Sequence, residues 1–155
     1  MKTNKLLIHR LLICTGLIWL GMIIGISFLE APAKFKAPSV TLEIGVDIGR
    51  YVFGIFNKVE CILALTMAIF VLIIKQSGRL LILLGVVWLS LALQTVWLLP
   101  VLAARSELII QGQTPPPSVS HTIYVVLEVI KTVSLAVYGF WKVLRGKTGS
   151  EIAVR

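Results

Sequence analysis

The chain has 155 residues, of which 57% are hydrophobic and 14% are charged, and its formal net charge is +8 at pH 7. Soluble domains carry about 25% charged residues, so this chain has too little polar surface for a water-soluble globule. The mean hydropathy of +0.95 predicts an integral membrane protein, whose first partner is the lipid bilayer. Lys and Arg flank the apolar runs and form no basic patch, so nucleic-acid binding is not expected.

The first apolar run covers roughly residues 6–29. A helix needs about 20 residues to cross the hydrocarbon core. Signal-peptide cores are only about 7–15 residues long, so we expect an uncleaved first span. Gly21 and Gly25 form a G-x-x-x-G pattern here. This pattern is typical of close helix packing, either within the chain or in a dimer.

Residues 30–50 follow as an outer loop. Apolar residues alternate with other residues from Val40 to Ile48, which is the pattern of a strand. A single strand would have no partner, and an open strand edge cannot lie in lipid. We therefore expect an interfacial helix or an early extension of the second span.

Three more apolar runs are long enough to cross a membrane, at roughly 51–74, 80–103 and 121–144. The short turn at 75–79 allows only antiparallel neighbours, and residues 104–120 form a proline-rich outer loop. The sequence thus predicts an all-α protein with one transmembrane domain over residues 1–155. Its helices would form an antiparallel, up-down-up-down four-helix bundle.

The distribution of Lys and Arg predicts the orientation of this bundle. These residues are more frequent beside the N-terminus, the 75–79 turn and the C-terminal segment than beside the two outer loops. The positive-inside rule then places both termini in the cytoplasm. We expect a multi-pass protein of the bacterial inner membrane.

Polar side chains fall mainly in the outer half of the predicted bundle. The candidate intramembrane cluster comprises Lys58, Glu60, Gln94, Glu128 and Lys131. A charge at the bilayer centre costs about 2.5–3.5 kcal/mol, so these charges should be paired. Glu128 and Lys131 are three residues apart, on one face of the fourth helix, and can pair. Glu128 is also expected to pair with Lys58 across the bundle.

Two interpretations of this cluster stay open. Paired charges can set helix register, as a buried polar residue does in a coiled coil. Intramembrane ionisable residues also mark proton, ion or substrate sites. The near cancellation of opposite charges slightly favours the structural interpretation.

No other constellation predicts chemistry. His9 and His121 fall on opposite faces of the membrane in this topology, and no His, Cys or Met spacing resembles a metal site. Neither a nucleophile beside a base nor a phosphate-binding glycine loop is found. We expect no metal, no cofactor and no catalytic residue, so the sequence leans away from an enzyme.

The segments GISFLEAPAKF (25–35) and IGRYVFGIFNK (48–58) resemble small four-span bacterial proteins related to eukaryotic transmembrane protein 205. The matching positions are Ala31, Pro32, Phe35, Gly49 and Phe56, and LLPVLAAR (98–105) is similar to the end of the family's third span. Asn57 stands where the family tends to have Pro, and Glu128 and Lys131 where it favours His and Ser. The resemblance implies the four-span fold but no reaction.

Three function classes follow. The small size, short loops and lack of a soluble domain favour a non-enzymatic accessory or partner-binding subunit of a membrane assembly, with other subunits or further copies as partners. The alternative is a small oligomeric transporter or channel that uses the charge cluster. The third is a membrane enzyme that acts on a lipid or a quinone.

Overall fold

The computed structural model describes residues 2–76 and 78–152, with side chains described over 5–76 and 78–142. All secondary structure in these residues is helical. Four stretches are long and apolar enough to cross a membrane, namely Lys5–Lys36, Leu42–Ile74, Arg79–Ile110 and Ser120–Lys142. By length and composition, therefore, the chain is a multi-pass membrane protein, as its sequence predicts.

Two of the four stretches are composite. The first consists of α1 (Lys2–Ile23), a π-helical segment η1 (Ile24–Glu30), α2 (Ala31–Ala33) and a 3₁₀ turn η2 (Lys34–Lys36). The third consists of α4 (Arg79–Leu93), a π-helical segment η3 (Gln94–Leu98) and α5 (Leu99–Ile110). The other two are single helices, α3 (Leu42–Ile74) and α6 (Ser120–Ile152). Residues 42–50, part of the predicted outer loop, form the first turns of α3.

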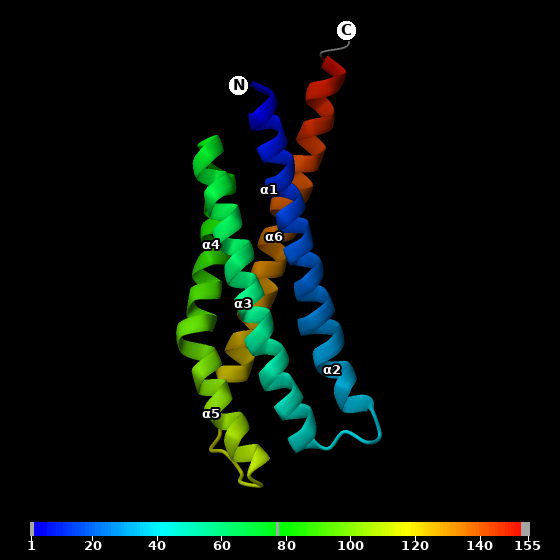
Figure 1. Ribbon diagram of the computed structural model, residues 1–155, viewed down its shortest axis with the longest axis vertical. Helices are drawn as coiled ribbons and strands as arrows, with labels where there is room; N and C mark the ends of the chain where they lie inside the picture. The colour runs from blue at the N-terminus through cyan, green and yellow to red at the C-terminus, as the bar shows by residue number, and fades with distance from the viewer. Residues whose placement is uncertain (1, 77, 153–155) are drawn as a thin grey trace.

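The helices pack side by side around a common core. α1 contacts α3 and α6, α6 contacts α4, and α3 contacts α5, so the packing closes into a ring. Figure 1 shows the two ends of the chain at the top, and the 37–41 and 111–119 connections at the bottom. We refer to the bottom end as the loop end of the bundle.

Each π-helical segment ends two residues before a proline, at Pro32 and Pro100. Proline lacks the N–H that would bond the carbonyl four residues earlier, and its ring clashes with that carbonyl. The carbonyls concerned belong to Phe28 and Val96, inside η1 and η3. A helix accommodates such a break by widening locally into a π turn. The sequence therefore explains where both segments occur.

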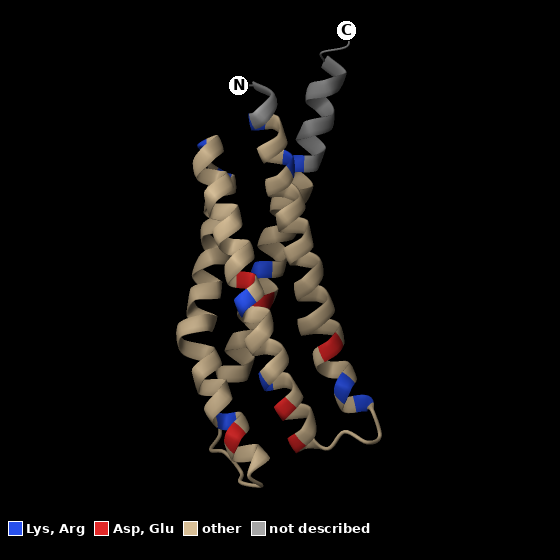
Figure 2. Cartoon of the chain, in the orientation of Figure 1, with Lys and Arg blue, Asp and Glu red and all other residues tan. Residues whose placement is uncertain are grey.

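The inward face of α6 changes character along its length. Its buried side chains include Tyr124, Glu128, Lys131, Leu135 and Tyr138. They recur every three or four residues, which is the period of one helix face. Leu135 and Tyr138 join an apolar core with Leu12, Met67 and Leu84. Figure 2 shows charged residues at both ends of the bundle and in one group midway along it.

The close-packed glycines differ from the predicted pair. A Cβ on Gly45 would collide with the Phe35 ring, and one on Gly49 would lie 3.0 Å from Lys34 Nζ. These two glycines let η2 approach α3 closely. A Cβ on Gly21 or Gly25 would meet nothing within 4 Å, so this G-x-x-x-G pair makes no close helix contact with the described part of the chain. The dimer alternative for Gly21 and Gly25 stays a prediction.

Candidate functional site

Lys131 is the centre of a buried charge cluster between α3 and α6. Its ammonium nitrogen lies 2.5 Å from Glu60 Oε1 and 3.1 Å from Glu128 Oε1. All three side chains are at most 1% exposed. Burying ions costs several kcal/mol each, and only close pairing offsets this cost. Lys131 therefore makes both carboxylates tolerable in the interior.

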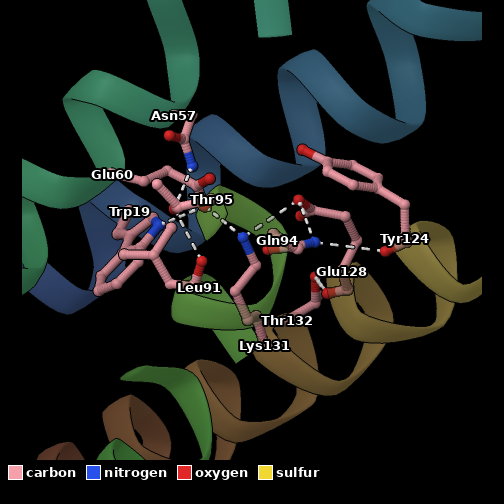
Figure 3. Close-up of polar contacts among 10 residues, drawn as sticks. All are labelled: Trp19, Asn57, Glu60, Leu91, Gln94, Thr95, Tyr124, Glu128, Lys131 and Thr132. Carbon is pink, nitrogen blue, oxygen red and sulfur yellow. Dashed lines mark hydrogen bonds and ion pairs between the residues drawn. The ribbon is translucent and has the colours of Figure 1, made fainter. Parts of the chain in front are cut away.

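Two further side chains donate to the same carboxylates (Figure 3). The Trp19 indole nitrogen donates to Glu60 Oε1 at 2.9 Å. The Gln94 amide nitrogen donates to Glu128 Oε1 at 3.1 Å and to the Tyr124 carbonyl at 3.3 Å. The residues of the cluster are Trp19 from α1, Glu60 from α3, Gln94 from η3, and Tyr124, Glu128 and Lys131 from α6. It joins all four membrane-length stretches.

The structure brings together four of the five predicted cluster residues: Glu60, Gln94, Glu128 and Lys131. Lys58 is a correction to the sequence analysis. It lies on the exposed face of α3, and no ion pair joins it to the described part of the chain. Residues two apart on a helix point in different directions, so burial of Glu60 turns Lys58 outward. Lys131, from the same helix as Glu128, bonds both acids.

Sequence reasoning missed Trp19, Tyr124 and Ser27. Trp19 is fully buried, although tryptophan usually lies in the interface belt of a membrane protein. Its position in the middle of an apolar span was the available signal. Tyr124 precedes Glu128 by one helical turn and is 4% exposed. Ser27 shows no pattern that would have identified it.

The cluster contains more acid than base. Two carboxylates, on Glu60 and Glu128, face one ammonium, on Lys131. If all three were ionised, one net negative charge would be buried, which is costly in a low-dielectric interior. The second oxygens, Glu60 Oε2 and Glu128 Oε2, are buried and lack a hydrogen-bond partner. A bound proton or a cationic ligand would supply the missing positive charge.

A cavity of about 580 Å³ extends from the cluster towards the loop end of the bundle. Volumes of about 300–1,000 Å³ are typical of small-molecule sites. Glu128 and Tyr124 both line this cavity, whereas Glu60 does not. The rest of the wall is mainly apolar and comes from η1, α2, η2, α3, α5 and α6. Both π-helical segments border the site, since Ser27 and Phe28 of η1 line the cavity and Gln94 of η3 bonds Glu128.

The cations along the cavity are already paired. Lys34 lies 3.4 Å from Glu30, and its ammonium also approaches the rings of Phe35 and Phe53. Arg50 bonds Asp47 at 2.9 Å and Glu107 at 2.5 Å. The Arg50–Glu107 pair links α3 to α5 beside the cavity. Among the described residues, no group of three or more His, Cys, Asp or Glu could hold a metal ion.

No family model, curated protein or solved structure matches the chain. The resemblance to the family related to transmembrane protein 205 therefore stays a prediction. The function must be argued from the cluster and the cavity.

Proposed function

We propose that this protein is a small membrane carrier that binds a small molecule in the cavity and couples its binding to a proton on Glu128. The observation that carries this proposal is the position of Glu128. Its carboxylate belongs to the buried cluster, and it also lines the cavity. An intramembrane carboxylate accessible from a cavity is a typical proton or substrate site. This is the transporter alternative of the sequence analysis.

The proposed topology places both termini in the cytoplasm of a bacterial inner membrane, with antiparallel spans. Lys and Arg are concentrated near the ends of the chain and the 75–79 turn, which supports this orientation. The cavity would then open towards the outer surface. Apolar core residues such as Leu12, Met67 and Leu84 fill the opposite half of the bundle. In this proposal the conformation would correspond to a carrier closed to the cytoplasm.

The charge balance explains why a proton is required. Glu60 Oε1 accepts from both Trp19 and Lys131, and these two donors favour its ionised form. Glu128 borders the cavity and can exchange a proton with water that enters it. A proton on Glu128 makes the cluster neutral. Glu128 would release this proton when a substrate binds and take it up again when the substrate leaves. Substrate binding would thereby be coupled to proton binding.

Reconstitution into liposomes tests this function. A pH-sensitive dye trapped in the liposomes would report proton movement after addition of cationic, anionic and neutral small molecules, compared with protein-free liposomes. We expect a protein-dependent proton movement for at least one chemical class, and its loss in Glu128→Gln. Glu43→Gln is the matched control, because Glu43 is an exposed residue in the first turn of α3. The absence of protein-dependent proton movement with every class, from protein shown to be folded, would contradict the proposal.

A second candidate function is the accessory subunit favoured by the sequence, and one observation supports it. The outward face of α3 is apolar except at Lys58. Its exposed side chains, spaced alternately four and three residues apart, are Tyr51, Ile55, Lys58, Ile62, Leu65, Ile69 and Leu72. An unpaired charge on a lipid-facing helix is costly. An acidic residue on a membrane helix of another subunit would pair with Lys58.

Native mass spectrometry of the gently solubilised, untagged protein tests this second candidate. We expect a heteromeric complex that Lys58→Met weakens and that Lys36→Met leaves intact, since Lys36 is exposed in η2. A homo-oligomer or a monomer under the same conditions contradicts the accessory role. Neither result changes the proton movement expected of a carrier.

A further inference from the structure

Three residues that line the cavity bury a polar atom that has no hydrogen-bond partner among the described residues. These atoms are Ser27 Oγ, Tyr124 Oη and Glu128 Oε2. Tyr124 is 4% exposed and Glu128 is 1% exposed. A buried polar group without a partner destabilises the fold, because it has lost its hydrogen bonds to water. Their shared cavity indicates a ligand that supplies the missing hydrogen bonds.

The geometry near Glu128 favours a hydrogen-bond donor on that ligand. Figure 3 shows the Tyr124 hydroxyl and the Glu128 carboxylate on the same side of α6. An ionised carboxylate only accepts hydrogen bonds, and hydroxyls can accept as well as donate. An ammonium group has several donors and no acceptor. It would satisfy Glu128 Oε2 and Tyr124 Oη together.

The charges around the cavity favour a cation over an anion. Each described cation that lines it is already paired, Lys34 with Glu30 and Arg50 with both Asp47 and Glu107. At the inner end, Glu60 and Glu128 share the single Lys131. An anion would have to break an ion pair and then approach an acidic cluster. A cation would complete the charge balance.

The walls of the cavity are complementary to a ligand whose remaining part is apolar. Phe28, Phe53, Leu99, Leu102 and Val125 line the cavity. The rings of Phe53 and Tyr124 meet edge to face, with 5.7 Å between their centroids. Aromatic faces attract an ammonium ion that lies within about 6 Å. Apolar walls, aromatic rings and a buried acid are together complementary to an amphiphilic cation.

We propose that the cavity binds a lipophilic primary amine in its protonated form, with the ammonium on Glu128 Oε2 and the apolar body against the aromatic wall. This proposal rests on the carrier function and names its substrate class. Binding is an exchange in which the neutral Glu128 carboxyl loses its proton and forms an ion pair with the incoming ammonium. One proton is released for each amine bound, so net charge in the site is conserved.

The groups around Glu128 determine how this exchange depends on pH. Lys131 and Gln94 occupy Glu128 Oε1, and Glu60 lies beyond Lys131. Lys34, Arg50 and His121 line the cavity, and α1 contributes the neutral Trp19 through Glu60. None of the described groups offers a free ammonium to Glu128 Oε2. Protons therefore compete with the amine, and its affinity should fall as the pH is lowered.

Three probes with the same apolar body separate the alternatives: phenylbutylammonium, phenylbutanol and phenylpentanoate. Isothermal titration calorimetry of the detergent-solubilised full chain would compare their affinities. We expect the amine to bind at least about tenfold more tightly than the alcohol, and the carboxylate to bind most weakly. Titrations in buffers with different ionisation enthalpies should give close to one proton released per amine at a pH where Glu128 starts protonated.

Two variants separate specific binding from partition into the micelle. Glu128→Gln should abolish the preference for the amine and the proton release, whereas Glu43→Gln should keep both. If Glu128→Gln does not fold, Tyr124→Phe keeps the carboxylate, removes the hydroxyl and should weaken amine binding several-fold. Equal affinity for amine and alcohol overturns the proposal, and so does tighter binding of the carboxylate. Amine binding that is unchanged in Glu128→Gln, or in Tyr124→Phe if Glu128→Gln does not fold, also overturns it.

The failure of this inference differs from the failure of the proposed function. Proton movement with an anionic or neutral substrate, and none with the amine, keeps the carrier and rejects the amine. A copurifying lipid that fills the cavity and is not displaced by the amine also rejects the amine. A lack of proton movement with all classes rejects the carrier itself.

Discussion

Lys131 Nζ and Glu60 Oε1 lie 2.5 Å apart, although the two residues are separated by 71 positions in the sequence. Their contact joins the middle of α6 to the middle of α3, away from water. The same ammonium also bonds Glu128, one turn earlier on α6. One lysine thus compensates two acids on different helices.

Replacement of Lys131 should strongly destabilise the fold. In Lys131→Met, Glu60 and Glu128 lose their buried counter-charge, a change that typically costs about 3–5 kcal/mol. We expect a clearly lower thermal unfolding midpoint in detergent. Lys58→Met is the matched control, because Lys58 is exposed and has no described ion pair. Equal midpoints for the two variants would show that the buried pairs contribute nothing.

The neutral combination Glu60→Gln, Lys131→Met and Glu128→Gln should recover much of the loss. Replacing a whole buried charge network by neutral groups of similar size is often close to neutral, unlike removal of one partner. The same thermal unfolding measurement checks this. A triple variant as unstable as Lys131→Met alone would indicate that packing, rather than unpaired charge, explains the single variant.

Trp19→Phe should lower stability through one lost hydrogen bond. The indole N–H of Trp19 donates to Glu60 Oε1 at 2.9 Å, and phenylalanine keeps an aromatic ring but no donor. A buried acceptor that loses a donor costs about 1–3 kcal/mol. Trp97→Phe is the control, because Trp97 is 51% exposed. We expect a lower unfolding midpoint for the first variant only, and equal midpoints would contradict the assigned role of the indole.

Glu107→Gln should change stability only slightly, although it breaks a short ion pair. Arg50 and Glu107 are 31% and 47% exposed, and exposed pairs contribute about 0.2–1 kcal/mol. Asp47 also remains as a partner for Arg50. We expect a midpoint close to that of the unmodified chain. A loss as large as that of Lys131→Met would mean that this pair is shielded from solvent.

Substitutions at the four glycines should fall into two groups. Gly45→Ala forces the Phe35 ring to move, and Gly49→Ala crowds Lys34 Nζ. The new Cβ in Gly21→Ala or Gly25→Ala would have no heavy atom within 4 Å. Alanine also stabilises a helix interior by about 1 kcal/mol relative to glycine. Thermal unfolding should show losses at Gly45 and Gly49 and slight gains at Gly21 and Gly25. If Gly21 packs in a dimer, Gly21→Leu should dissociate that dimer and leave the monomer folded.

The distribution of apolar residues in the sequence was enough to locate the four membrane-length runs, because the bilayer imposes a length and an apolar composition on any helix that crosses it. The structure has four membrane-length helical stretches over those runs. The alternation from Val40 to Ile48 resembles a strand, but residues 42–50 lie in α3, which agrees with the expected early extension of the second span. Thr41 caps that helix by accepting from the Ile44 N–H, and α3 supplies its own backbone partners. A single strand here would have had no partner for its backbone hydrogen bonds.

By itself, the sequence determined which side chains are costly in the membrane and that Glu128 and Lys131 share a helix face, because both follow from hydrophobicity and helical period. Tertiary structure decided the partners. Helix packing buried Glu60 and so turned Lys58 outward. The same packing brought Trp19 to Glu60 and Gln94 to Glu128, and left Glu128 beside a cavity. Rotation of each helix about its axis decides these contacts, and that rotation depends on how neighbouring surfaces pack rather than on the pattern of any single span.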